Sequence, residues 1–75
     1  DEAEAIELVA TSGSKYVGKA LREVEFPRGA LVGAIVRPTG EVEVPHGDST
    51  IQLDDRVIFF CREDVVAKLE KAFIY

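Results

Sequence analysis

Residues 30–61 read ALVGAIVRPTGEVEVPHGDSTIQLDDRVIFFC, and this stretch decides the fold. Apolar runs alternate in it with three turn signals, at residues 37–40 (RPTG), 45–48 (PHGD) and 53–55 (LDD). Proline, glycine and aspartate at such short intervals divide a chain into strands and leave little room for a helix between them. The stretch therefore predicts a compact meander of three strands, with no evident reaction chemistry.

The strands of this meander differ in their hydrophobic pattern. Residues 31–37 and 56–61 are apolar at almost every position, which is typical of strands that are covered on both faces. Residues 41–44 (EVEV) alternate instead. This alternation predicts that Val42 and Val44 point inward while the two glutamates point to water.

The segments outside the meander predict two helices and one further strand. Residues 16–24 place apolar side chains at spacings of four and three, and residues 63–73 carry a longer apolar stripe of the same kind. Asp64 and Lys68 stand four residues apart in the second helix, a spacing that favours an ion pair. Residues 5–10 (AIELVA) read as the additional strand.

The resulting element order is β-α-β-β-β-α. It predicts a small α+β domain with a mostly antiparallel sheet and two helices on one face. The strands at 31–36 and 57–61 carry apolar residues for both faces, but a chain of 75 residues has no element left for the second face. We therefore predict a homodimer, or docking onto the rest of a larger chain.

Composition limits the classes of protein that the chain can represent. With 47% hydrophobic and 31% charged residues it is typical of one soluble globular domain. A net charge of −5 argues against nucleic acid as a partner. The apolar runs are far shorter than the roughly 20 residues that span a bilayer, so no membrane insertion is expected.

The chain begins with Asp1, which suggests a piece of a longer polypeptide. Cys61, the single cysteine, is expected to be a buried, unreactive core residue.

Arg37 and His46 are the candidate polar contacts for a ligand, and each has two interpretations. The guanidinium of Arg37 could hold a phosphate through two hydrogen bonds, or it could cap the adjacent turn as an exposed side chain. The imidazole of His46 could bond a phosphate or stack on a base. Alternatively it is a turn histidine, hydrogen-bonded to nearby backbone with Asp48 as a partner.

Neither a metal site nor a catalytic group is predicted. Zinc needs three or four ligands, and His46 and Cys61 lie too far apart in the sequence to begin such a set. Asp54 and Asp55 lack the shaped loop of six to eight oxygens that calcium requires. Since His46 has no nucleophile at a recognisable spacing, and no glycine-rich phosphate loop occurs, we expect the chain not to be an enzyme.

Four segments together resemble the TrkA C-terminal domain, also called the C-terminal lobe of RCK domains. They are VGKAL at 17–21, IVR at 35–37, PHGD at 45–48 and DRVI at 55–58, and the resemblance covers essentially the whole chain. The family commonly has glycine before the aspartate that opens the last strand, whereas this chain has Asp54. Because aspartate tolerates left-handed backbone, we expect the turn to survive.

The resemblance implies regulation rather than catalysis. It identifies residues 1–75 as one TrkA-C regulatory domain, part of a larger protein, that acts from the cytoplasm on a membrane potassium channel or transporter subunit. Lobes of this family form dimers, and several bind a small ligand at the dimer interface. Cyclic di-AMP is the ligand in some relatives, and divalent cations act in others.

Two hypotheses about function follow from this resemblance. In the first, the lobe senses a ligand such as cyclic di-AMP between two copies. The location of these residues suggests that Leu31, Val32 and Ile35 form the apolar walls of the ligand site. Arg37 and His46 would be its polar anchors. In the second hypothesis the lobe is a purely structural dimerisation domain that has no ligand of its own.

Overall fold

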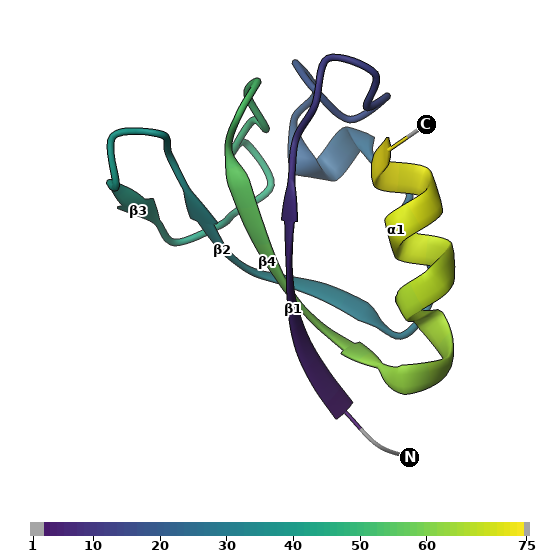
Figure 1. The fold of residues 1–75 in the computed structure, drawn as a ribbon. Coiled ribbons are helices and arrows are strands. Elements are labelled where there is room, and N and C mark those ends of the chain that lie inside the picture. Colours follow the sequence, from purple (N-terminus) through teal and green to yellow (C-terminus); the bar gives the residue numbers. More distant parts are fainter. Residues whose placement is uncertain (1–2, 75) are drawn as a thin grey trace.

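A computed structural model describes residues 3–74 of the chain as a four-stranded antiparallel sheet with helical cover on one side (Figure 1). The order of strands across the sheet is β1-β4-β2-β3. The elements, in chain order, are β1 (Ala3–Val9), the 3-10 turn η1 (Leu21–Glu23), β2 (Ala30–Val36), β3 (Val42–Glu43), β4 (Arg56–Arg62), the 3-10 turn η2 (Glu63–Val65) and α1 (Val66–Ile74). The predicted α+β class and antiparallel sheet are confirmed.

The core lies between the inner face of the sheet and helix α1. The ring of Phe59 in β4 meets Phe73 of α1 edge-on, with 5.8 Å between centroids. Tyr16, from the loop after β1, packs against the same Phe73 ring at 5.7 Å. Apolar burial of this kind supplies most of the folding free energy of a small domain. The fully buried large side chains of the core are Phe59, Phe73, Ile35, Ile51, Leu69 and Val57.

The outer face of the sheet is apolar as well, as the unbroken hydrophobic runs predict. Leu31 of β2 lies opposite Phe60 of β4. Their side chains are 67% and 52% exposed, respectively. Val42 and Val9 add exposed apolar area at β3 and β1. We call the surface formed by Val9, Leu31, Val42 and Phe60 the outer apolar face.

Gly33 shapes this face. The ladder between β2 and β4 shifts register between Val32 and Ala34, and Gly33 lies in the shift. A Cβ atom placed on Gly33 would lie only 2.2 Å from a ring carbon of Phe60. The absence of a side chain at Gly33 therefore allows the Phe60 ring to lie directly against the backbone of β2.

The helix predicted over residues 16–24 is replaced by irregular structure. Gly18 adopts φ +87°, which lies outside the right-handed helical region, and its N–H donates to the carbonyl of Ile51 at 2.7 Å. Val17 and Ala20 form isolated bridges to residues 51 and 50. Only Leu21–Glu23 coils, as the 3-10 turn η1. Backbone bonds to residues 49–51 hold this segment, and its apolar side chains Val17, Leu21 and Val24 pack against the core without forming a helix.

Strand β3 presents the opposite face to the one predicted. Val42 and Val44 are exposed, and Glu43 is half-buried. The register pairs Glu43 with Ile35, whose side chain points into the core, and Val42 with Val36. Glu43 is held on the inner side because its carboxylate accepts hydrogen bonds there from Arg37 and Ser49.

Two local predictions have clear outcomes. Asp54 adopts φ +70°, so the turn before β4 does place an aspartate in the left-handed region, as expected. Asp64 accepts a hydrogen bond from the guanidinium of Arg62 at 2.6 Å, instead of pairing with Lys68. Lys68 is exposed on the surface of α1 and forms no ion pair with Asp64.

Candidate functional site

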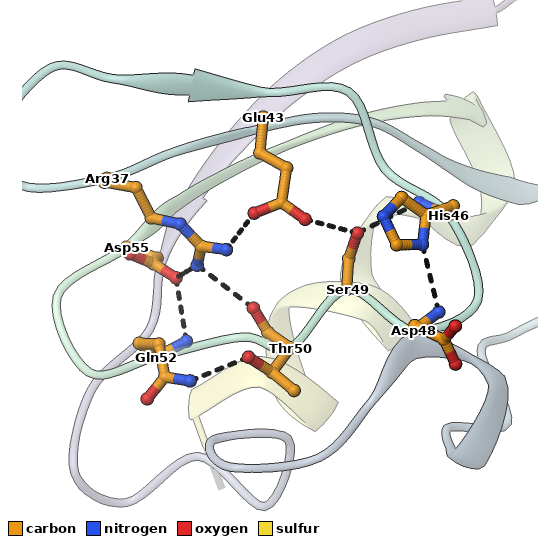
Figure 2. Close-up of polar contacts among 8 residues, drawn as sticks. All are labelled: Arg37, Glu43, His46, Asp48, Ser49, Thr50, Gln52 and Asp55. Atoms are coloured by element: carbon orange, nitrogen blue, oxygen red, sulfur yellow. Dashed lines mark hydrogen bonds and ion pairs between the residues drawn. The ribbon is translucent and has the colours of Figure 1, made fainter.

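Arg37 lies at the centre of a polar cluster at one end of the sheet (Figure 2). It directly follows β2, and its Nη1 donates to the carboxylate of Asp55 and to the carbonyl of Thr50, the latter at 3.0 Å. Its Nη2 donates to Glu43. The Arg37 side chain is 19% exposed and that of Asp55 is fully buried. The cluster therefore ties the ends of β2, β3 and β4 together.

The electrostatics of the cluster follow from these contacts. Burial alone would lower the pKa of Arg37, but its hydrogen bonds to Glu43 and Asp55 outweigh that effect and raise it. A hydrogen bond from Ser49, at 2.5 Å, and a second from Arg37 lower the pKa of Glu43 below its usual range. Asp55 also accepts the backbone N–H of Gln52 at 2.7 Å. The contacts thus favour the charged forms of Arg37 and Glu43 at neutral pH.

This placement decides what Arg37 can do geometrically. Three of the five N–H donors of its guanidinium are already engaged by two carboxylates and a carbonyl, and the side chain is only 19% exposed, so little of it is open to a ligand phosphate. The side chain is therefore not the exposed cap of one alternative, because it is largely buried and links three strand ends. A direct contact with a ligand stays a prediction.

A groove of about 300 Å³ lies at the edge of β2. Three of the five predicted ligand contacts line it, namely Leu31, Val32 and His46. The full lining is Leu21, Arg22, Phe26, Ala30, Leu31, Val32, Pro45, His46 and Gly47. Ile35 does not line the groove because its side chain is fully buried beneath the sheet. We call this hollow the β2 groove.

His46 sits on the rim of the β2 groove in a defined orientation. Its Nδ1 accepts the backbone N–H of Asp48 at 3.2 Å, and its own backbone N–H donates to Ser49 Oγ at 3.0 Å (Figure 2). These contacts agree with the interpretation as a turn histidine bonded near Asp48. With Nδ1 as the acceptor, the neutral ring carries its proton on Nε2, which can donate to a ligand.

Arg22 is a groove residue that the sequence alone does not reveal. It follows Leu21 in η1, and its backbone N–H donates to the carbonyl of Gly47 at 3.0 Å, which brings the two loops together. Its guanidinium pairs with Asp48, and both side chains are well exposed. An exposed pair of this kind is weak, so an incoming anion could take over the guanidinium at little cost. Phe26, also missed, supplies an aromatic wall.

Two absences apply to the described part of the chain. Within residues 3–74, no three His, Cys, Asp or Glu side chains come together as a set that could hold a metal ion. Over the same residues, no helix has the length and apolar character needed to cross a membrane.

Comparison with known proteins gives relatives and structural neighbours of one kind. The Trk system potassium uptake protein TrkA homolog of Archaeoglobus fulgidus is 39% identical over 72 residues, which make up 96% of this chain and 16% of that protein. The chain thus spans about a sixth of the length of this curated relative.

Two solved structures share the fold. An RCK domain structure, described as being with cda, superimposes with a TM-score of 0.81 at 28% identity and covers 92% of this chain and 96% of that one. The RCK_C domain dimer of S. agalactiae BusR in complex with c-di-AMP gives a TM-score of 0.79 at 28% identity, covering 92% of this chain and 88% of that one. The TrkA-C domain model matches residues 5–74, so the chain belongs to the TrkA-C domain family, the C-terminal lobe of RCK domains.

Proposed function

We propose that this chain is a cytoplasmic regulatory domain of a potassium transport system, which dimerises and senses a small ligand without catalysing a reaction. The observation that carries the proposal is the position of Leu31. Its side chain belongs both to the outer apolar face and to the lining of the β2 groove. A second copy that covers the face would therefore also close the groove around a ligand.

The outer apolar face supplies a reason for two copies to associate. Leu31 and Phe60 lie opposite each other on neighbouring strands and are both more than half exposed. Large apolar side chains grouped in this way mark interaction surfaces, and burying them between copies is favourable in proportion to area. Most soluble homo-oligomers are two-fold dimers, so each copy would present the same face. The BusR neighbour is itself described as a domain dimer.

The β2 groove matches one half of a cyclic dinucleotide. Its walls are apolar, including the ring of Phe26, and its rim carries the Arg22 guanidinium and the His46 imidazole. An apolar hollow with a few polar groups is typical of a ligand site. Cyclic di-AMP is two-fold symmetric, so two grooves facing each other across a dimer axis could each take one base and one phosphate. The structural neighbours support this ligand class, since BusR is described in complex with c-di-AMP.

Regulation would follow from differential affinity. A ligand held between two lobes favours the dimer arrangement that closes the groove, and it can shift the attached transport protein only by that preference. A tenfold preference corresponds to about 1.4 kcal/mol. The relative from Archaeoglobus fulgidus is named for potassium uptake, which supports such a system as the target.

Titration calorimetry with cyclic di-AMP, paired with sedimentation, tests the proposal. We expect one ligand bound per two chains. Leu31→Ala should weaken binding about fivefold, because roughly 1 kcal/mol of apolar contact is lost. Leu53→Ala is the matched control, since Leu53 is also an exposed leucine but does not line the β2 groove. His46→Ala should weaken binding about tenfold through its lost hydrogen bond.

Two results would contradict different parts of the proposal. A dimeric sample that releases no heat with cyclic di-AMP would remove this ligand and leave a purely structural dimerisation domain. A folded species that stays monomeric at high concentration would remove the dimer itself, and with it the shared groove.

A further inference from the structure

The cationic side chains of the molecule divide into two groups. Arg22, Arg37, Arg56 and Arg62 each form an ion pair with a carboxylate. The other five form no ion pair with any of residues 3–74, and these are Lys15, Lys19, Arg28, Lys68 and Lys71. The chain has a net charge of −5, so acidic residues outnumber basic ones. Five cations without an acidic partner are therefore unexpected and need an explanation.

All five of these cations line one continuous surface between helix α1 and the loop at residues 15–28. The largest hollow there, of about 520 Å³, is lined by Lys15, Tyr16, Glu25, Phe26, Pro27, Arg28, Val65, Lys68 and Ala72. A second, of about 310 Å³, adds Lys71. A third, of about 250 Å³, adds Lys19. Lys15 lines all three, so the hollows adjoin, and we call them together the basic groove.

Ordinary helix electrostatics account for only part of this clustering. Lys71 lies in the last turn of α1, where cations are favoured by the helix dipole, but Lys68 is the third residue of the helix and gains nothing from that dipole. Lys15, Lys19 and Arg28 come from a different segment that has no such dipole. Asp64, four residues before Lys68, could have formed an ion pair with it, but Asp64 pairs with Arg62 instead.

The few acidic groups of the basic groove do not neutralise it. Among residues 3–74, Glu23 and Glu25 are the only acidic residues that line any of its hollows. The carboxylate of Glu23 is occupied locally, because its Oε1 accepts the backbone N–H of Ala20 at 2.9 Å. The surface therefore keeps an excess of positive charge that an anionic partner could satisfy.

We propose that the basic groove docks an acidic, partly apolar peptide segment of a partner protein. Cations spread over three adjoining hollows suit an extended anion better than a single phosphate group. Between the cations lie apolar side chains, including Phe26, Val65 and Ala72, which can receive the apolar residues of such a segment. The groove lies apart from the outer apolar face, so the docking does not depend on dimerisation. Phe26 lines both the basic groove and the β2 groove.

Fluorescence anisotropy with a labelled peptide of alternating glutamate and leucine tests the docking. A peptide with glutamine in place of glutamate should not bind, and raising the salt concentration should weaken binding of the acidic one. Arg28→Gln and Lys68→Gln should each weaken binding between about 1.5-fold and fivefold, as neutralising an exposed pair does. Arg56→Gln changes net charge equally but lies outside the groove, and it should leave binding unchanged.

Three outcomes would overturn the inference. Equal weakening by Arg56→Gln would show attraction to the molecule as a whole rather than to the groove. Displacement of the peptide by an equal concentration of tripolyphosphate would show a phosphate site. Self-association that the Arg28→Gln and Lys68→Gln double variant abolishes would make the occupant a second copy of this chain. Because all substituted side chains are on the surface, circular dichroism should show that each variant keeps its fold.

Discussion

The carboxylate of Asp55 is fully buried, and the ion that neutralises it there is the guanidinium of Arg37. The two residues lie at the end of β2 and just before β4, neighbouring strands of the sheet. Removing one partner of a buried pair leaves the other charge without compensation, which costs far more than the pair contributes. The pair therefore gives Arg37 a structural role, which is to compensate the buried charge of Asp55.

Arg37→Leu should destabilise the domain by about 3 kcal/mol, because Asp55 would be left buried and unpaired. Urea unfolding followed by circular dichroism measures the change. Arg56→Leu, which breaks the exposed pair with Glu7, should cost less than about 1 kcal/mol. An Arg37 variant as stable as the wild type, with weaker ligand binding only, would contradict this structural role and favour the interpretation as a ligand clamp.

Stability should fall at acid pH through Glu43. Its pKa in the folded state is lowered from the ordinary 4.5 by the Ser49 and Arg37 hydrogen bonds, so its contribution is present above that value. The contribution is lost as the pH falls through the lower folded pKa. Glu43→Gln should therefore reduce the loss of Tm between about pH 6 and pH 3, while Glu41→Gln, at an exposed position, serves as the control. Parallel Tm profiles for wild type and Glu43→Gln would contradict this.

Gly33→Ala should cost about 1 to 3 kcal/mol, because its methyl group would meet the Phe60 ring. In a Phe60→Ala background the same substitution should be nearly neutral, since the ring is gone. A double-mutant cycle of unfolding free energies measures this coupling. Simple additivity of the two substitutions would mean that backbone conformation, and not the ring, makes glycine necessary at this position.

Cys61 should be unreactive in the native protein. Burial raises the pKa of its thiol, with the negative charge of Glu4 acting in the same direction, so little thiolate forms at neutral pH. Reaction with a chromogenic disulfide should be at least about a hundredfold slower in buffer than in urea. Fast modification without unfolding would place the thiol at the surface.

Much of the fold could be predicted because its turns are encoded locally. Gly40, with φ +93°, and Asp54, with φ +70°, occur where the sequence signals turns; β2 ends before the first turn and β4 begins after the second. The prediction of a helix over residues 16–24 was wrong because apolar spacings of four and three also occur in irregular segments that pack on one side. The positive φ of Gly18 rules out a continuous helix there, and a single glycine is a weak signal of that in sequence.

The candidate site was harder to predict because its contacts are non-local. Alternation over residues 41–44 indicates two faces, but it cannot tell which face is inward when a buried Arg37 needs Glu43 as a partner. Arg22 reaches the β2 groove only because η1 bonds to the backbone of Gly47. The sequence could predict that Leu31, Val32 and His46 lie near one another, because neighbouring strands and turns of a meander lie close together.

Strand β1 pairs with β4, the last strand of this sheet in sequence order. Ala3–Val9 pairs along its whole length with Arg56–Arg62, so β1 must wait for the synthesis of β4. Contacts between such distant positions slow folding, because a large loop must close before they form. On the ribosome, β1 would therefore emerge as an unpaired strand, and the complete sheet could assemble only after β4 has been released.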